Sequence, residues 1–110
     1  CMQNYSEAAF WYEEGAKRGH LESFNNLGAL YKEGHGVPKD EARTFICFSR
    51  AADGGLAEGL YNLGMLYDQG VGCEQDHDKA LDLCRKAAYK GHEKAKGIIK
   101  GLQEDGKIVF

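Results

Sequence analysis

The sequence predicts an all-α protein, a superhelix (solenoid) of antiparallel helical hairpins with a 36-residue repeat. Two stretches are nearly the same, NNLGALYKEGHG at 25–36 and YNLGMLYDQGVG at 61–72, and an offset of 36 residues superimposes them. Apolar residues within each stretch recur at intervals of three and four, which gives a helix one apolar face. An offset held over many positions indicates an internal repeat, and helical repeats stack into solenoids.

The same offset extends over most of the chain. Gly19, Gly55 and Gly91 are in register, and each follows a segment with helical spacing. With 110 residues, the chain has room for a single repeat domain, 1–110. Its predicted units are a half-hairpin at 4–18, a hairpin at 19–54, a hairpin at 55–90, a capping half-hairpin at 91–104 and a tail at 105–110.

The first helix of each hairpin is predicted from its apolar spacing and its closing glycine. In the first copy, Leu27, Leu30 and Tyr31 fall on one helical face. Gly34 and Gly70 stand where the two helices should end, and glycine readily adopts the left-handed conformation that closes a helix. We therefore expect a first helix to end at each of these glycines.

The second helix of each hairpin is predicted to start after an aspartate. Asp40 and Asp76 each precede an amphipathic run, and a carboxylate there accepts hydrogen bonds from free N–H groups at the positive end of the helix dipole. The second helices are expected to close at Gly55 and Gly91. Their predicted apolar sides are Ala42, Phe45, Ile46 and Ser49 in one copy and Ala80, Leu83, Ala87 and Ala88 in the other.

Gly28 and Gly64 fall inside predicted helices, where glycine costs about 1 kcal/mol relative to alanine. A second helix that crosses very closely would account for a glycine at this position. The expected opposite wall is the small residues of the second helices, Ala51, Ala52, Ala87 and Ala88.

The two ends of the chain are incomplete repeats. Residues 4–18 match a second helix without its first helix, and residues 93–104 match a first helix. In that last helix, the pattern Asn-Leu-Gly-x-Leu-Tyr has changed to IIKGLQ at 98–103, so its outer face is more polar, as a capping helix requires. The closing GKIVF could dock on the last helix, pair with a partner as a strand, or continue into a longer chain.

Composition argues against two classes of partner. The net charge is −3 and the pI is near 5.8, whereas a protein that binds nucleic acid usually carries a cationic face. No apolar run reaches the roughly 18 residues of a membrane span. We therefore predict no nucleic-acid partner and no membrane partner.

The four cysteines, at 1, 47, 73 and 84, do not follow the repeat and have no CxxC or zinc-finger spacing. They are interpreted either as partly buried free thiols or as including at least one disulfide.

No group of residues predicts catalysis. The best metal-ligand candidates lie in CEQDHD at 73–78, but Asp76 is already expected to cap a helix. His20 and His92 each directly follow a glycine that the repeat shares, and no Ser or Cys nucleophile has a placed base. The chain is therefore predicted not to be an enzyme and to need no metal or other cofactor, and lowered thiol pKa values or bound metal would contradict this.

The repeat resembles a known family. The stretches NLGALYKEGHGVPKDEARTFICFSRAADGG and NLGMLYDQGVGCEQDHDKALDLCRKAAYKGH are similar to Sel-one-like repeats (SLR), which are relatives of the tetratricopeptide repeats. The opening FWYEEGAKRGH supplies the family's aromatic pair and its Gly-His ending, so the resemblance covers about residues 4–103. The sequence departs from the family pattern at Arg43-Thr44, at Cys47 and Leu83, and at Cys73. The paired cysteines of a disulfide-stapled branch of the family are absent.

This resemblance implies an adaptor or scaffold that binds a protein or peptide on the concave face of the solenoid. Tyr61 and Met65 would hold an apolar anchor residue. Asn26 and Asn62 would either contact a bound peptide backbone or tie the hairpins together. The residues implied for the concave face are Glu22, Asn25, Asn26, Ala29, Lys32, Glu58, Tyr61, Asn62, Met65 and Asp68.

Two further hypotheses concern partners. The chain could instead be a small inhibitor or immunity-type protein that blocks one dedicated enzyme, which would show one very tight partner with buried charge. With close to three repeats, the chain is near the lower limit for a continuous core, so we expect either a longer parent protein or self-association through the terminal helices.

Overall fold

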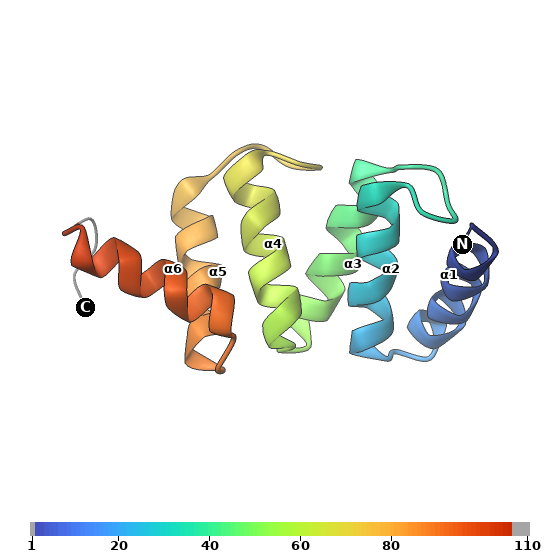
Figure 1. The fold of residues 1–110 in the computed structure, drawn as a ribbon, viewed down its shortest axis with the longest axis horizontal. Helices are drawn as coiled ribbons and strands as arrows, with labels where there is room; N and C mark the ends of the chain where they lie inside the picture. Colours follow the sequence, from blue (N-terminus) through green and yellow to red (C-terminus); the bar gives the residue numbers. More distant parts are fainter. Residues whose placement is uncertain (1, 107–110) are drawn as a thin grey trace.

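The structure, a computed structural model, describes residues 2–106, with side chains described from Asn4 onward. In this range, six helices and no strands follow one another along an elongated body of 46 × 24 × 23 Å (Figure 1). None of them is both long and apolar enough to cross a membrane. The helices are α1 (Met2–Lys17), α2 (Leu21–Glu33), α3 (Glu41–Asp53), α4 (Ala57–Gln69), α5 (His77–Tyr89) and α6 (Glu93–Glu104).

Each helix packs mainly on the helices directly before and after it in the chain, which confirms the all-α repeat superhelix. We call α2, α4 and α6 the first helices and α1, α3 and α5 the second helices, after their places in the repeat. From α1 at one end to α6 at the other, the two kinds alternate along the long axis (Figure 1).

The predicted helix ends are confirmed in both hairpins. Gly34 and Gly70 both have φ of 71°, and each donates its backbone N–H to the carbonyl four residues earlier. The carboxylates of Asp40 and Asp76 accept the backbone N–H three residues later, at 3.0 and 3.1 Å. Because caps and closing glycines act locally, they could be located from the sequence alone.

The predicted apolar side of α3 is wrong. Ala42 is exposed and Ile46 is 53% exposed, whereas Thr44 is fully buried. Apolar residues occupy four consecutive positions at 45–48, so helical spacing alone could not choose the buried side, and the contacts with α2 and α4 decide it. The buried residues of α3 are Thr44, Cys47, Phe48, Ala51 and Ala52.

Helices cross closely at Gly28 and Gly64 as predicted, but not against the expected alanines. A Cβ on Gly28 would lie 2.8 Å from the ring of Phe48 and 3.1 Å from Cβ of Cys47. At Gly64, the nearest atom would be the carbonyl oxygen of Ala80, at 3.2 Å. Ala51 meets a different glycine, Gly59, where a Cβ would come within 2.6 Å of the alanine's own. The closest approach to an alanine is thus in the contact between the two hairpins.

The described cysteines, Cys47, Cys73 and Cys84, are free thiols. Cys47 and Cys84 are buried, and Cys73 is half-buried. Cys1 and residues 107–110 lie outside the described residues, so the predictions for Cys1 and for the GKIVF tail are not tested there.

Candidate functional site

The residues predicted for the concave face lie on two first helices, α2 and α4, and differ in exposure. Asn25 is buried, with only 8% of its surface exposed. The exposed members are Glu22, Asn26, Ala29, Glu58 and Asp68, and the half-buried members are Lys32, Tyr61, Asn62 and Met65.

Two of these residues join α2 to α4. The side-chain amide of Asn62 donates a hydrogen bond to the side-chain oxygen of Asn25, at 2.8 Å. A buried amide needs such a partner, because an unpaired one would cost roughly 1–3 kcal/mol. The bond favours the alternative in which Asn62 ties the hairpins together.

A different set of contacts joins α4 to α6. The rings of Tyr61 and His92 stack at 4.4 Å between centroids, with an interplanar angle of 19°. Nδ1 of His92 accepts the backbone N–H of Ala95 at 3.2 Å and so caps α6. Nε2 is therefore the nitrogen that can donate to the carboxylate of Glu58, 2.6 Å away. These contacts hold Tyr61 and Glu58, two predicted site residues, against the start of α6.

A cavity of about 470 Å³ opens between the first helices α4 and α6, and we call it the first-helix cavity. Two predicted site residues, Met65 and Asp68, line it, and α5 supplies the wall between α4 and α6. The repeat positions of Asn25 and Asn62 are held by Tyr61 and Ile98 one repeat later. The hydrogen bond that joins α2 to α4 therefore has no counterpart between α4 and α6. The full lining is Met65, Asp68, His77, Asp78, Ala80, Leu81, Cys84, Ile98 and Leu102.

The polar groups of the first-helix cavity are mainly acidic. Asp68 and Asp78 are both exposed, and Nδ1 of His77 lies 2.8 Å from a carboxylate oxygen of Asp68. The other lining residues are apolar. An apolar cleft with a few convergent polar groups is typical of binding sites, where the apolar part supplies affinity and the polar groups fix orientation.

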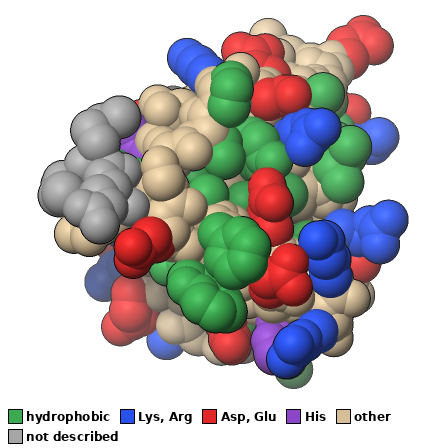
Figure 2. All heavy atoms as spheres, turned by 90° about the vertical axis from the view of Figure 1, so that its right-hand side faces the viewer, with side chains coloured by type: hydrophobic (Ala, Val, Ile, Leu, Met, Phe, Trp, Pro, Cys, Tyr) green, Lys and Arg blue, Asp and Glu red, His purple; other side chains and the backbone are tan. Residues whose placement is uncertain are grey.

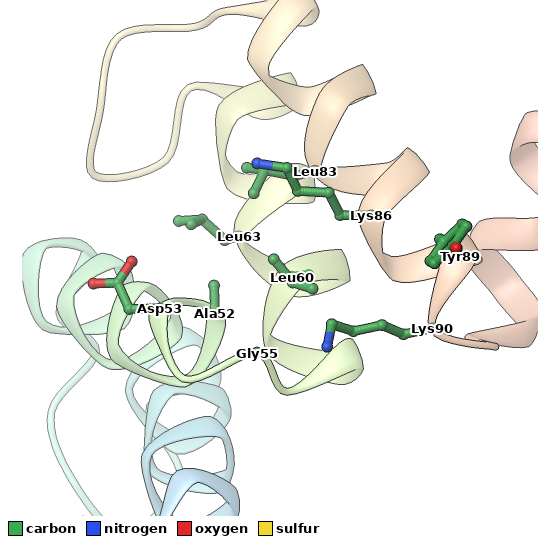
Figure 3. Close-up of a pocket in the computed structure, with 9 residues that line it drawn as sticks. All are labelled: Ala52, Asp53, Gly55, Leu60, Leu63, Leu83, Lys86, Tyr89 and Lys90. Atoms are coloured by element: carbon green, nitrogen blue, oxygen red, sulfur yellow. The ribbon is translucent and has the colours of Figure 1, made fainter.

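A second cavity, of about 460 Å³, lies between the second helices α3 and α5, and we call it the second-helix cavity (Figure 3). Leu60 and Leu63 of α4 lie between Asp53 on α3 and Lys86 on α5 (Figure 3). Tyr89, also in the lining, is 94% exposed. Sequence reasoning missed this cavity, whose exposed Tyr89 follows Ala87 and Ala88 at the end of α5.

The metal-ligand candidates at 73–78 are engaged in local contacts. Asp76 caps α5, and His77 pairs with Asp68. Across residues 4–106, no three histidine, cysteine or acidic side chains gather as a metal site would require.

The described thiols are not activated. Burial raises the pKa of Cys47 to about 11. The charge of Arg43 lowers this pKa by a smaller amount, and the charge of Glu13 raises it by less still. Burial also raises the pKa of Cys73 and of Cys84. Catalytic thiols need the opposite change, a lowered pKa that favours the thiolate.

Solved structures with the same architecture include proteins from three bacteria. A protective antigen present in uropathogenic Escherichia coli strains, displaying an SLR fold, superposes with a TM-score of 0.85 at 31% identity, over 93% of this chain and 22% of its own. A Sel1 repeat protein from Oxalobacter formigenes gives 0.86 at 29% identity, over 94% of this chain and 41% of its own. The chain therefore spans less than half the length of either protein.

The third structure is Helicobacter pylori cysteine rich protein B. It superposes with a TM-score of 0.77 at 24% identity, over 82% of this chain and 68% of that protein. At this identity, the match shows only a shared fold.

The family comparison agrees with the resemblance seen in the repeats. The model of the Sel1 repeat matches residues 1–20, 25–56 and 57–92, which is most of the chain. The first match is shorter than the other two and corresponds to α1 alone. The alternation of first and second helices, the αL glycines and the aspartate caps recur in both full repeats. The chain belongs to the Sel1 repeat family.

Proposed function

We propose that this chain is an adaptor or scaffold module that binds a protein partner on its first helices, with the first-helix cavity as the anchor pocket. Sel1 repeat proteins are generally protein-interaction modules on a non-catalytic repeat scaffold. The observation that carries the proposal is that Met65 and Asp68, which the family resemblance implies for the concave face, line a cavity with apolar walls.

The chemistry of the first-helix cavity indicates the kind of segment it would bind. Apolar walls at Met65, Leu81 and Ile98 suit one buried aliphatic or aromatic side chain. The carboxylates of Asp68 and Asp78 suit a lysine or arginine beside that anchor, because opposite charges favour the correct register. The proposed partner is therefore a segment with an apolar anchor next to a basic residue.

Selection from a random peptide library displayed on phage tests the proposal. We expect the selected peptides to share an apolar residue next to lysine or arginine. Their affinity should fall at least about tenfold for a Met65→Ala/Ile98→Ala double variant, since both side chains line the first-helix cavity and an anchor contact typically contributes more than 1 kcal/mol. Tyr89→Ala is the matched control, because it removes an exposed aromatic ring from the second-helix cavity.

Circular dichroism must first show that both variants are folded. Peptides that lose affinity for Tyr89→Ala and keep it for the double variant would move the site to the second-helix cavity. The selected peptides could also lack basic residues and bind an Asp68→Asn/Asp78→Asn variant as tightly as the unchanged chain. That result would show that the two carboxylates play no part in binding. Capture from a lysate of the source organism, with the same variants, would then identify the partner.

A further inference from the structure

The exposed large hydrophobic side chains do not all share one environment. At the α1 end of the molecule, Figure 2 shows hydrophobic side chains among charged groups of both signs, which favours no particular charge in a partner. Tyr89 is different, because it is 94% exposed and lines the second-helix cavity together with Lys86 and Lys90 of the same helix (Figure 3). An exposed aromatic ring beside an apolar cavity is typical of a binding surface.

The floor of the second-helix cavity is apolar. Leu60 and Leu63 of α4 are buried, and Leu83 of α5 is half-buried. Together with Ala52 of α3, they line a space of about 460 Å³. A space of this size accommodates one large aliphatic or aromatic side chain of a partner, which would gain affinity from the apolar surface that it buries.

The second-helix cavity continues along α5 as a groove. Leu63 and Leu83 also line a neighbouring cavity of about 390 Å³, which includes Tyr67 and Lys79. From Lys79 to Lys90, a helix rises by about 16 Å. This length corresponds to about five residues of extended chain. The groove therefore suits a segment of a protein better than a small molecule.

Two lysines and one aspartate are the charged groups that line the second-helix cavity. Lys86 and Lys90 extend from α5 over the cavity, and Asp53 stands on α3 opposite them (Figure 3). The amine of Lys90 would lie 3.3 Å from a Cβ placed on Gly55, in the turn between α3 and α4. Among the described residues, neither Asp53 nor Lys90 forms an ion pair. Lys86 pairs with Asp82 at 3.2 Å, but both side chains are at least 60% exposed, so this pair contributes little and is easily exchanged.

The repeat itself does not require a lysine at position 90. In the first hairpin, Gly54 holds this position, and a Cβ placed on it would collide with the side chain of Leu21. The residue in the register of Leu21 in the second hairpin is Ala57. The first hairpin thus has a close apolar contact where the second has a small residue and a free amine. Packing of the hairpin does not explain this amine, whereas a ligand with a negative charge would.

We propose that the second-helix cavity is a second binding site, for a protein segment that carries an apolar anchor residue next to an acidic residue. The anchor packs on Leu60 and Leu63, and the carboxylate binds the amines of Lys86 and Lys90. Asp53 on the opposite wall opposes this carboxylate. The first-helix cavity shares no lining residue with this site and is expected to prefer the opposite charge, so this proposal does not depend on binding there.

The test is a selection from a random peptide library displayed on phage, made against the Met65→Ala/Ile98→Ala variant, which weakens the first-helix cavity. Counter-selection against the same variant with Lys86→Glu/Lys90→Glu removes peptides that bind elsewhere. We expect the remaining peptides to share an apolar residue next to aspartate or glutamate. In the otherwise unchanged chain, Lys86→Glu/Lys90→Glu should lower their affinity at least about tenfold. Asp53→Asn should raise it about twofold, because it removes an opposing charge.

The matched control is Lys94→Glu/Lys100→Glu, which changes the net charge equally at two exposed positions of α6 outside the cavity. Its effect on affinity should be less than about twofold. Circular dichroism must show that each variant is folded. If the charge reversal does not fold, Lys86→Gln/Lys90→Gln replaces it, with an expected loss of about threefold.

Three results would overturn the proposal. The first is that no peptide survives the counter-selection. The second is an equal loss of affinity in the control, which would reduce the attraction to a general effect of net charge. The third is a set of basic peptides that lose affinity for Asp53→Asn, which would reverse the charge of the ligand. Failure of the first-helix cavity to bind its own peptides would contradict only the proposed function, because these readouts come from the other cavity.

Discussion

The junctions between α2 and α4 and between α4 and α6 occupy the same place in successive repeats, yet different interactions hold them. At the first junction, the side chains of Asn25 and Asn62 share a hydrogen bond of 2.8 Å. At the second junction, the same two repeat positions hold Tyr61 and Ile98. The polar contact there is instead a hydrogen bond between His92 and Glu58. The first-helix cavity opens beside the second junction.

This difference separates two roles of the repeat. The shared glycines and aspartate caps set where each helix starts, ends and crosses its neighbour, and these are the same in both hairpins. Other positions differ between the repeats. Those of Asn25 and Asn62, which become Tyr61 and Ile98, determine whether a junction holds a hydrogen-bonded polar pair or an apolar cavity. Binding sites on such scaffolds can therefore change without a change of fold.

The largest expected effect compares the two hairpins at one repeat position, held by Phe48 in the first and by Cys84 in the second. Both side chains are 3% exposed. We expect Phe48→Ala to lower the free energy of unfolding by about 3–5 kcal/mol, because it leaves a large cavity. Cys84→Ala should cost about 1 kcal/mol, since it removes a single sulfur atom. Urea unfolding measures both, and equal losses would show that the two hairpins are not packed differently at this position.

A smaller expected effect concerns the thiol of Cys47, whose pKa of about 11 results mainly from burial. At pH 8, we expect it to react with a disulfide reagent about 100-fold more slowly than a thiol with a pKa near 9, because only the thiolate reacts. Half-buried Cys73 should react first. The experiment uses a Cys1→Ser background, and fast labelling of Cys47 would show that α2 does not keep the thiol covered.

The same pKa predicts the effect of alkaline pH on stability. In the unfolded chain, the Cys47 thiol ionises at lower pH than in the folded chain, so the unfolded state loses its proton first. The free energy of unfolding should therefore fall as the pH rises from the ordinary thiol value towards about 11. In a Cys47→Ala variant this part of the decline should be absent.

The smallest expected effect tests the hydrogen bond at the first junction. Asn62→Ala would leave the buried amide of Asn25 unpaired, which should cost about 1–3 kcal/mol. Ile98→Ala, at the same repeat position in the second junction, should cost less than about 1 kcal/mol, because Ile98 is 37% exposed and has no such partner. Thermal unfolding of an Asn25→Ala variant and of an Asn25→Ala/Asn62→Ala double variant completes the test. If replacing both residues costs as much as the sum of the two single changes, the bond does not couple the hairpins.

Part of the site could be predicted from the resemblance to a known repeat family. The resemblance implies Met65 and Asp68 for the concave face, and both line the first-helix cavity. Asn25 was placed on the same face, but it is buried by its contact with Asn62 on the next first helix. That contact spans 37 residues of sequence, and no local pattern specifies its partner.

The walls supplied by α5 and α6 could not be predicted in the same way. His77, Asp78 and Leu81 reach the first-helix cavity from a second helix, and Ile98 reaches it from the last helix. The second-helix cavity likewise depends on three helices that meet only after stacking. Cavities lie between elements, so their walls depend on the distances between helices and not on the spacing within one helix.

The sequence by itself determined the number of helices, their ends and the order of first and second helices. These follow from periodicity, capping aspartates and closing glycines, which act over a few residues. The tertiary structure decided which faces of α1 and α3 are covered. Trp11 and Cys47 hold the same place in the repeat, yet one is 65% exposed and the other 6%, because only Cys47 has a first helix packed against it. Burial depends on neighbouring helices, and these neighbours differ along the row even where the repeat does not.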